Sequence, residues 1–160
     1  MMVGISGHRR LRDPAGWEWV GRELLTCLAP LPPRVVGVTS LAIGADTVFA
    51  EAVLRLGGAL KVVVPFAGYE ERFDEGRERE RYLSLLGRAA SVEVLRAEVT
   101  EQEAYFAAGR RVVDISSLLL LVWDGRPAAG LGGTGDIAAY ARRERKAVVH
   151  INPETRTVTR

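Results

Sequence analysis

The sequence has one cysteine, Cys27, two histidines, and no apolar run of the roughly 20 residues that a membrane span needs. A single cysteine cannot form an internal disulfide bond, and Cys27 lies in an apolar helical pattern that is typical of a buried free thiol. His8 and His150 are not spaced as zinc ligands. The apolar start, residues 1–6, is too short for a signal sequence, so we expect a soluble, cytoplasmic protein with no membrane partner.

The chain also lacks a large excess of charge of either sign. Its 22 lysines and arginines against 20 acidic residues give a formal net charge of +2. A dedicated nucleic-acid-binding protein usually carries a stronger positive field, so the composition does not favour nucleic acid as a partner. The length of 160 residues is typical of one domain with its own core, and we expect a single domain over residues 1–160.

Short β-branched runs alternate with longer helical patterns along the chain, which predicts an α/β fold with a mainly parallel sheet. Several of the runs are apolar at consecutive positions, as in strands that are buried on both faces. A turn at residues 152–155 would let residues 156–159 return as an antiparallel edge strand. The six main strands are expected at residues 3–6, 35–39, 60–64, 92–95, 118–123 and 147–151.

Helices are expected between these strands. Asp13-Pro14 offers a cap and a first-turn proline for a helix that continues to residue 28. Thr100 to Glu103 has the spacing of a capping box. The other expected helices cover residues 45–56, which end at a glycine pair, residues 70–88 with a solvated charged face, residues 101–113, and residues 134–145.

Two glycine loops, each between a strand and a helix, supply candidate ligand residues. In open parallel sheets this is the end where ligands bind. In the first loop Gly7 would let the backbone approach a ligand, and His8 or Arg9 could meet an anion. In the second, Gly44 begins a helix whose free N–H groups can hold phosphate. Ser40 and Asp46 accompany it, either as ligand contacts or as a helix cap and a charge that complements the helix dipole.

The third loop carries the strongest signal, because glycines crowd the start of the last helix. It reads Gly130-Leu131-Gly132-Gly133-Thr134-Gly135-Asp136 and follows Trp123-Asp124-Gly125. Backbone amides without side chains can wrap an anionic group, and Thr134 adds a hydroxyl donor, so this is a candidate phosphate-binding loop. It has neither the lysine of a P-loop nor the G-x-G-x-x-G order, which argues against ATP hydrolysis and NAD-linked hydride transfer. A G-x-S-x-G hydrolase elbow is also missing.

Together these loops resemble the SLOG superfamily of Rossmann-like nucleotide-binding domains. That superfamily includes the DNA-processing protein A family, the YpsA-like proteins, and the "lonely guy" phosphoribohydrolases once labelled lysine decarboxylases. The pairing of Trp-Asp-Gly at 123–125 with Gly-Gly-Thr at 132–134 is most similar to the uncharacterised YpsA-like branch. The resemblance implies a Rossmann-like three-layer fold with the first strand central, glycine loops that converge on one nucleotide or phosphoribosyl site, and a homo-oligomer.

The sequence departs from the phosphoribohydrolase pattern at its catalytic position. That branch carries a glutamate three residues after the threonine, where this chain has Ile137. Asp136 is adjacent but lies about 100° away around a helix. Arg110 and Arg111 are not at the spacing of that branch's arginine. The catalytic candidates are therefore Asp136 and Asp124, either of which could orient a water molecule.

We predict that the chain binds a nucleotide or phosphoribosyl compound as a sensor or regulatory module. Tyr69 and Phe73 could each stack on a base, with Tyr69 the favoured one to flank the base or ribose and Phe73 otherwise anchoring its helix to the core. No cofactor is required, and Mg²⁺ would enter only with a ligand phosphate. Two alternatives stay open: an N-glycosidic hydrolase acting on a nucleoside monophosphate, and a single-stranded DNA-binding protein that uses Arg9, Arg10 and Arg12.

Overall fold

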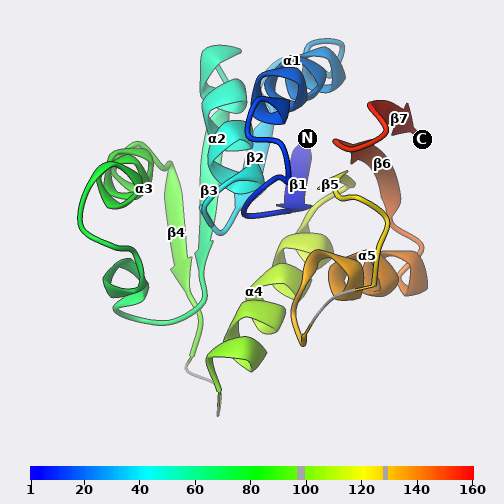
Figure 1. The fold of residues 1–160 in the computed structure, drawn as a ribbon. Coiled ribbons are helices and arrows are strands. Elements are labelled where there is room, and N and C mark those ends of the chain that lie inside the picture. Colours follow the sequence, from blue (N-terminus) through cyan, green and yellow to red (C-terminus); the bar gives the residue numbers. More distant parts are fainter. Residues whose placement is uncertain (97–99, 128–129) are drawn as a thin grey trace.

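The computed structural model describes residues 1–96, 100–127 and 130–160, and in these ranges seven strands form one sheet (Figure 1). The strand order is β4-β3-β2-β1-β5-β6-β7, and every pairing is parallel except that of β6 with β7. This confirms the predicted α/β fold, with the first strand central and an antiparallel edge strand at the end. The strands are β1 (Met2–Gly7), β2 (Val36–Thr39), β3 (Ala59–Val64), β4 (Ser91–Val94), β5 (Leu118–Val122), β6 (Ala147–Asn152) and β7 (Thr157–Thr159).

Helices cover both faces of the sheet and make three layers (Figure 1). They are α1 (Gly16–Leu28), α2 (Ala45–Arg55), the short 3-10 helix η1 (Tyr69–Arg72), α3 (Arg77–Gly87), α4 (Glu101–Ile115) and α5 (Thr134–Arg143). The helices α1 and α2 pack on one face, and α4 and α5 pack together on the other. None of the helices in the described ranges is both long and apolar enough to cross a membrane.

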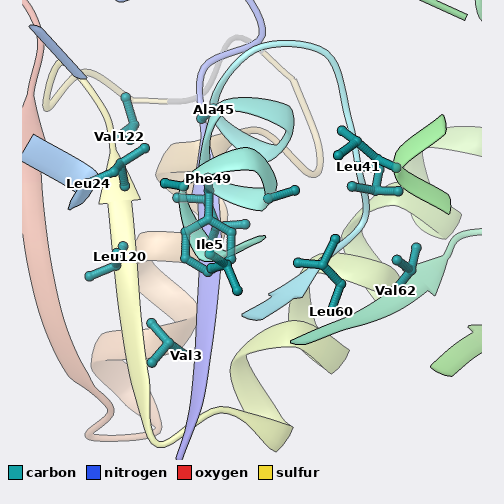
Figure 2. Packing of buried hydrophobic residues seen from close by; sticks show 14 of the residues in the cluster. Val3, Ile5, Leu24, Leu41, Ala45, Phe49, Leu60, Val62, Leu120 and Val122 are labelled. Carbon is teal, nitrogen blue, oxygen red and sulfur yellow. The ribbon is translucent and has the colours of Figure 1, made fainter. Parts of the chain in front are cut away.

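The consecutive apolar residues of the central strands supply both layers of the core. Along β5, Leu120 packs with Phe49 and the α1–α2 side, as Figure 2 shows, while Leu119 and Leu121 pack with the α4–α5 side. All of these side chains are almost fully buried. Full burial of a leucine side chain contributes about 2 kcal/mol, so a polar residue at any of these positions would weaken one of the two layers.

The order in which strands are added to the sheet reverses at β1, and this places the candidate loops side by side. The chain passes from β1 through β2 and β3 to β4, and then returns to the other side of β1 to form β5. Gly7 at the end of β1 pairs with Val122 at the end of β5. The loops that follow these two strands therefore meet at the carboxyl ends, the usual ligand position in an open α/β sheet.

The predicted helix over residues 70–88 is wrong as one element. It is divided into η1 and α3, because Phe73 turns into the core between them and Gly76 adopts a φ of 124°. Phe73 is 5% exposed, and its ring stacks on Tyr82 with centroids 4.6 Å apart. The burial of one aromatic side chain thus interrupts a stretch whose local pattern is helical.

The predicted cap at Asp13 is confirmed, because its carboxylate accepts the Ala15 N–H at 3.0 Å, and two short turns lead from Asp13 and Pro14 into α1 at Gly16. Helix α5 ends at Arg143 rather than at residue 145, because Arg145 has a φ of 51° and turns the chain toward β6.

The capping box at the start of α4 is confirmed. The Thr100 Oγ1 accepts the Glu103 N–H at 3.2 Å, and the Glu103 carboxylate accepts the Thr100 N–H at 2.9 Å. Thr100→Ala is expected to lower the free energy of unfolding by about 1 kcal/mol, because one helix N–H loses its acceptor. Urea unfolding at equilibrium measures it. Ser84→Ala, at an exposed position of α3, is the control, and an equal loss there would contradict the assignment.

Candidate functional site

A cavity of about 490 Å³ opens at the carboxyl ends of the central strands. Its volume is in the usual range for a small-molecule site. Of the predicted site residues, the structure places around this cavity Gly7, His8, Arg9, Ser40, Asp46, Tyr69, Asp124, Gly132, Gly133 and Thr134. Gly44, Gly130 and Asp136 do not line it.

Gly7 and Gly44 allow the start of α2 to pack directly against the loop after β1. A Cβ atom on Gly7 would lie 2.5 Å from the Ala45 Cβ, and one on Gly44 would lie 2.5 Å from the carbonyl oxygens of His8 and Arg9. Gly44 also has a φ of 91°, which side-chain-bearing residues rarely adopt. The Ala45 N–H donates to the His8 carbonyl oxygen at 3.1 Å. These glycines therefore fix the backbone that presents His8 and Arg9 to the cavity.

The Asp46 carboxylate accepts hydrogen bonds from the loop between β2 and α2. Its Oδ2 accepts the Thr39 hydroxyl at 2.8 Å and the Ser40 N–H at 2.9 Å. Burial raises the pKa of the Asp46 carboxyl to about 6, against the opposing effect of these hydrogen bonds. An ionised carboxylate at this position places negative charge beside the start of α2 and would repel an external phosphate.

His8 and Asp124 form a bonded pair on the cavity wall. The Asp124 N–H donates to the His8 Nε2 at 3.1 Å, and the Asp124 Oδ1 lies 3.2 Å from the same nitrogen. Burial alone would raise the pKa of the Asp124 carboxyl, but the Arg126 N–H and the nearby His8 outweigh it, so this pKa is lowered. Asp124 is therefore an oriented, ionised carboxylate that could hold a water molecule or a ligand hydroxyl.

Asp136, the other catalytic candidate, faces the glycine loop instead of the cavity. Its Oδ2 accepts the Gly132 N–H at 2.9 Å. Gly132 has a φ of 85°, and a Cβ atom there would lie 3.1 Å from the Gln102 carbonyl oxygen of α4. Asp136 and Gly132 together hold the loop close to α4, which is a structural role.

The start of α5 is the open helix terminus at this cavity. Its N-cap is Gly133, which supplies no side-chain acceptor. In the described part of the chain, no acceptor is bound to the N–H of Thr134 or Gly135. Both residues line the cavity. Two backbone donors and the positive end of the helix dipole are thus available to an anion.

The tyrosine predicted to flank the ligand, Tyr69, is buried, whereas Tyr105 at the same cavity is partly exposed. Tyr69 is 5% exposed and packs edge-on against Phe66, Phe73 and Tyr82 at centroid distances of 5.2–5.7 Å. Burial, helped by the charge of Asp46, raises the pKa of the Tyr69 hydroxyl. Its ring faces therefore contact the core, which leaves little surface for stacking on a base. Tyr105 of α4 is only half-buried and also lines the cavity.

Sequence reasoning missed one wall of the cavity. Helix α4 contributes Tyr105, Ala108, Gly109 and Val112, and the loop after β5 contributes Arg126. The α4 residues follow the ordinary pattern of a helix that packs on a sheet. The pair of small residues at 108–109 is the one sequence feature that indicates a close approach of another element to α4. A Cβ atom on Gly109 would lie 2.5 Å from the Ile137 Cδ1.

Arg110 and Arg111 of α4 do not line the cavity. Arg111 donates to Glu93 at 2.8 Å, and the Arg110 guanidinium lies 4.9 Å from the Tyr140 ring centroid. Within the described ranges no group of three or more His, Cys, Asp or Glu side chains is arranged to hold a metal ion.

Comparison with solved structures shows where this fold occurs. The chain is similar to DNA processing protein A from Streptococcus pneumoniae, with a TM-score of 0.64 and 18% identity, over 93% of this chain and 49% of that one. It is also similar to DNA processing protein A from Helicobacter pylori, described for its single-stranded DNA binding mode, with a TM-score of 0.61 and 17% identity over 94% and 64% of the two chains.

These comparisons show a shared fold. At such identities they carry no residue roles, and the chain spans about half to two thirds of the length of those proteins. No family model matches the sequence, and no curated protein matches it.

Proposed function

We propose that the chain binds a nucleotide or phosphoribosyl compound in this cavity, with a phosphate at the start of α5. One observation carries the proposal: the uncapped N–H groups of Thr134 and Gly135 open on the same cavity as the Arg9 side chain. Oriented amides and a guanidinium are the usual partners of phosphate in proteins. Any Mg²⁺ would come with the ligand phosphate.

The other helix starts are less suitable for a phosphate. The Asp46 carboxylate lines the cavity at the start of α2 and would repel a phosphate there, and Thr100 and Glu103 cap α4 reciprocally. The Asp13 carboxylate accepts the Ala15 N–H before α1. At the start of α5 the Asp136 carboxylate does not line the cavity, and in the described residues the N–H groups of Thr134 and Gly135 have no acceptor.

The remaining wall suits the less polar part of such a ligand. Ala108 and Val112 of α4, with Ile137 of α5, give an apolar surface, and Tyr105 adds a half-exposed ring. A ribose or base would lie along this surface, while its polar groups meet Ser40 or the His8–Asp124 pair. Apolar walls with a few placed polar groups are typical of small-molecule sites.

Binding without hydrolysis is the favoured form of the proposal. Ile137 is 2% exposed and lines the cavity at the position where the resembled phosphoribohydrolases carry their glutamate. Asp136 is engaged by the Gly132 N–H, which leaves Asp124 as the carboxylate for an N-glycosidic hydrolase. We accordingly propose a sensor or regulatory module of the SLOG superfamily, in its YpsA-like branch.

Single-stranded DNA is the second candidate ligand. The Helicobacter pylori protein, which shares this fold, is described for its single-stranded DNA binding mode. Arg9 and Arg126 at the cavity could contact its phosphates. Binding of this kind would weaken steeply with salt, with a slope set by the number of phosphates contacted.

A thermal-shift series tests the proposed function. The probes are nucleoside mono-, di- and triphosphates with and without Mg²⁺, applied to the parent and to Gly133→Glu. A nucleotide at about one hundred times its Kd should stabilise the parent by about 2.7 kcal/mol, or roughly 5–10 °C in Tm. The variant should show no shift, because its carboxylate would repel the phosphate at the start of α5.

Gly87→Glu is the matched control for this experiment. It makes the same charge change at an exposed glycine of α3, where an added Cβ meets nothing within 4 Å. The control should keep the full ligand-induced shift. A Tm shift in Gly133→Glu equal to that of the parent would show that the phosphate does not bind at the start of α5. The absence of any shift in the parent would refute nucleotide binding.

A further inference from the structure

A second cleft, of about 790 Å³, adjoins the cavity. The two share His8, Asp124 and Arg126, so the His8–Asp124 pair forms the wall between them. The second cleft extends from there between the loop after β1 and the turn that joins β6 to β7. Its other lining residues are Arg10, Leu11, Arg12, Asp13, Gly16, Pro153, Glu154 and Arg156.

Three of its arginines carry charge that the chain does not neutralise. Arg10, Arg12 and Arg156 are exposed, and none of the carboxylates in the described ranges lies within 4 Å of their nitrogen atoms. Arg156 packs over the Trp19 ring with 5.8 Å between the guanidinium and the ring centroid. This contact leaves the N–H groups of the guanidinium available to a ligand.

The acidic residues of the cleft are already engaged. Arg126 donates to Glu154 at 3.1 Å and lies 3.9 Å from the Asp124 carboxylate. The Asp13 carboxylate accepts the Ala15 N–H at 3.0 Å. Because arginines outnumber carboxylates in its lining, the cleft keeps a net positive charge, which comes from segments far apart in the sequence.

We propose that this arginine cleft, defined by Arg10, Arg12 and Arg156, binds a second phosphate-bearing part of the ligand whose first phosphate lies at α5. The inference rests on the proposed function and deepens it. The ligand class is then a phosphate-linked dinucleotide rather than a mononucleotide. Guanidinium groups recognise phosphate oxygens in pairs, and three of them around one cleft match one or two phosphates. The combined space of the two clefts is large enough for a second nucleoside.

Calorimetric titration with two series of probes tests this assignment. The first contains AMP, GMP, CMP and UMP, and the second contains the 5′-phosphorylated dinucleotide of each base. For the best base, the dinucleotide should bind roughly tenfold more tightly than the mononucleotide. In the double variant Arg12→Gln/Arg156→Gln this gain should disappear, while the Kd of the mononucleotide stays within about twofold.

Arg88→Gln serves as the control, because it removes the same charge from an exposed residue at the end of α3 and should change neither affinity. Equal affinity for the two series would overturn the arginine cleft and leave the proposed function standing. A dinucleotide gain that survives in the double variant would also overturn it. Affinity that keeps rising from the dinucleotide to a dodecamer of thymidylate would replace it with single-stranded DNA, and no binding of any probe would overturn both proposals.

Discussion

Gly44→Ala is expected to lower the free energy of unfolding by about 4 kcal/mol, which for a chain of this length is roughly 10 °C in Tm. Two costs add at this position. The φ of 91° disfavours any side chain, and the new Cβ would lie 2.5 Å from the carbonyl oxygens of His8 and Arg9. Because these are backbone atoms, the contact can be relieved only by moving the loop after β1 away from α2.

Gly57→Ala measures the cost of the backbone conformation without the cost of the steric contact. Gly57 also has a positive φ, 75°, but an added Cβ meets nothing within 4 Å. This variant should lose only about 1–2 kcal/mol, the cost of the backbone conformation alone. Urea unfolding of both variants measures the difference. Similar losses for the two would mean that α2 does not pack against the His8–Arg9 backbone as the structure has it.

The layered fold could be predicted because the information is local. Consecutive apolar residues such as Leu119 and Leu120 must face opposite sides of a strand, so both sides of the sheet need a covering layer. The capping box at Thr100 likewise involves groups only three residues apart. Strand and helix positions followed from patterns of this kind to within a few residues.

The features that were missed depend on contacts distant in the sequence. The stretch over residues 70–88 has the charge pattern of one helix, and its break follows from the stacking of Phe73 on Tyr82 inside the core. The burial of this one aromatic side chain determined the backbone between η1 and α3.

In the candidate site, too, some features could be predicted from the sequence and others could not. That the glycine loops should meet was implied by the family resemblance, and it agrees with the rule that ligand loops lie at the carboxyl ends of parallel strands. The direction of each side chain did not follow: Asp136 contacts Gly132 and Asp124 contacts His8, although the two aspartates stand at the two ends of the same loop between β5 and α5. Only the three-dimensional positions of the N–H groups decide which carboxylate remains in the cavity.

The second large expected effect is a pH dependence of stability that comes from Asp46. In the folded protein the pKa of its carboxyl is about 6, and its ordinary value is 3.8. Between these pH values the folded state holds the proton and the unfolded state does not, so the free energy of unfolding falls as the pH rises. The gap corresponds to about 3 kcal/mol, present in full below about pH 4 and lost above about pH 6.

Asp46→Asn removes this titration while keeping an oxygen that can accept from Thr39 or Ser40. Relative to the parent, the variant should therefore gain about 3 kcal/mol of stability between pH 4 and pH 7. Urea unfolding at several pH values measures the difference, in which the titrations common to both proteins cancel. A difference that stays flat over this range would show that the Asp46 carboxyl is not held in a raised-pKa environment.

Asp124→Asn should behave in the opposite direction and so tests the sign of the argument. The pKa of the Asp124 carboxyl is lowered in the folded state, so its contribution to stability is present above its unfolded pKa and lost as the pH falls. Relative to the parent, Asp124→Asn should lose stability as the pH rises toward about 4, and the difference should stay constant over the higher range where Asp46→Asn gains stability. Opposite slopes from two aspartates on one cavity would follow directly from their surroundings: Asp46 is buried among neutral donors, whereas Asp124 lies beside His8 and Arg126.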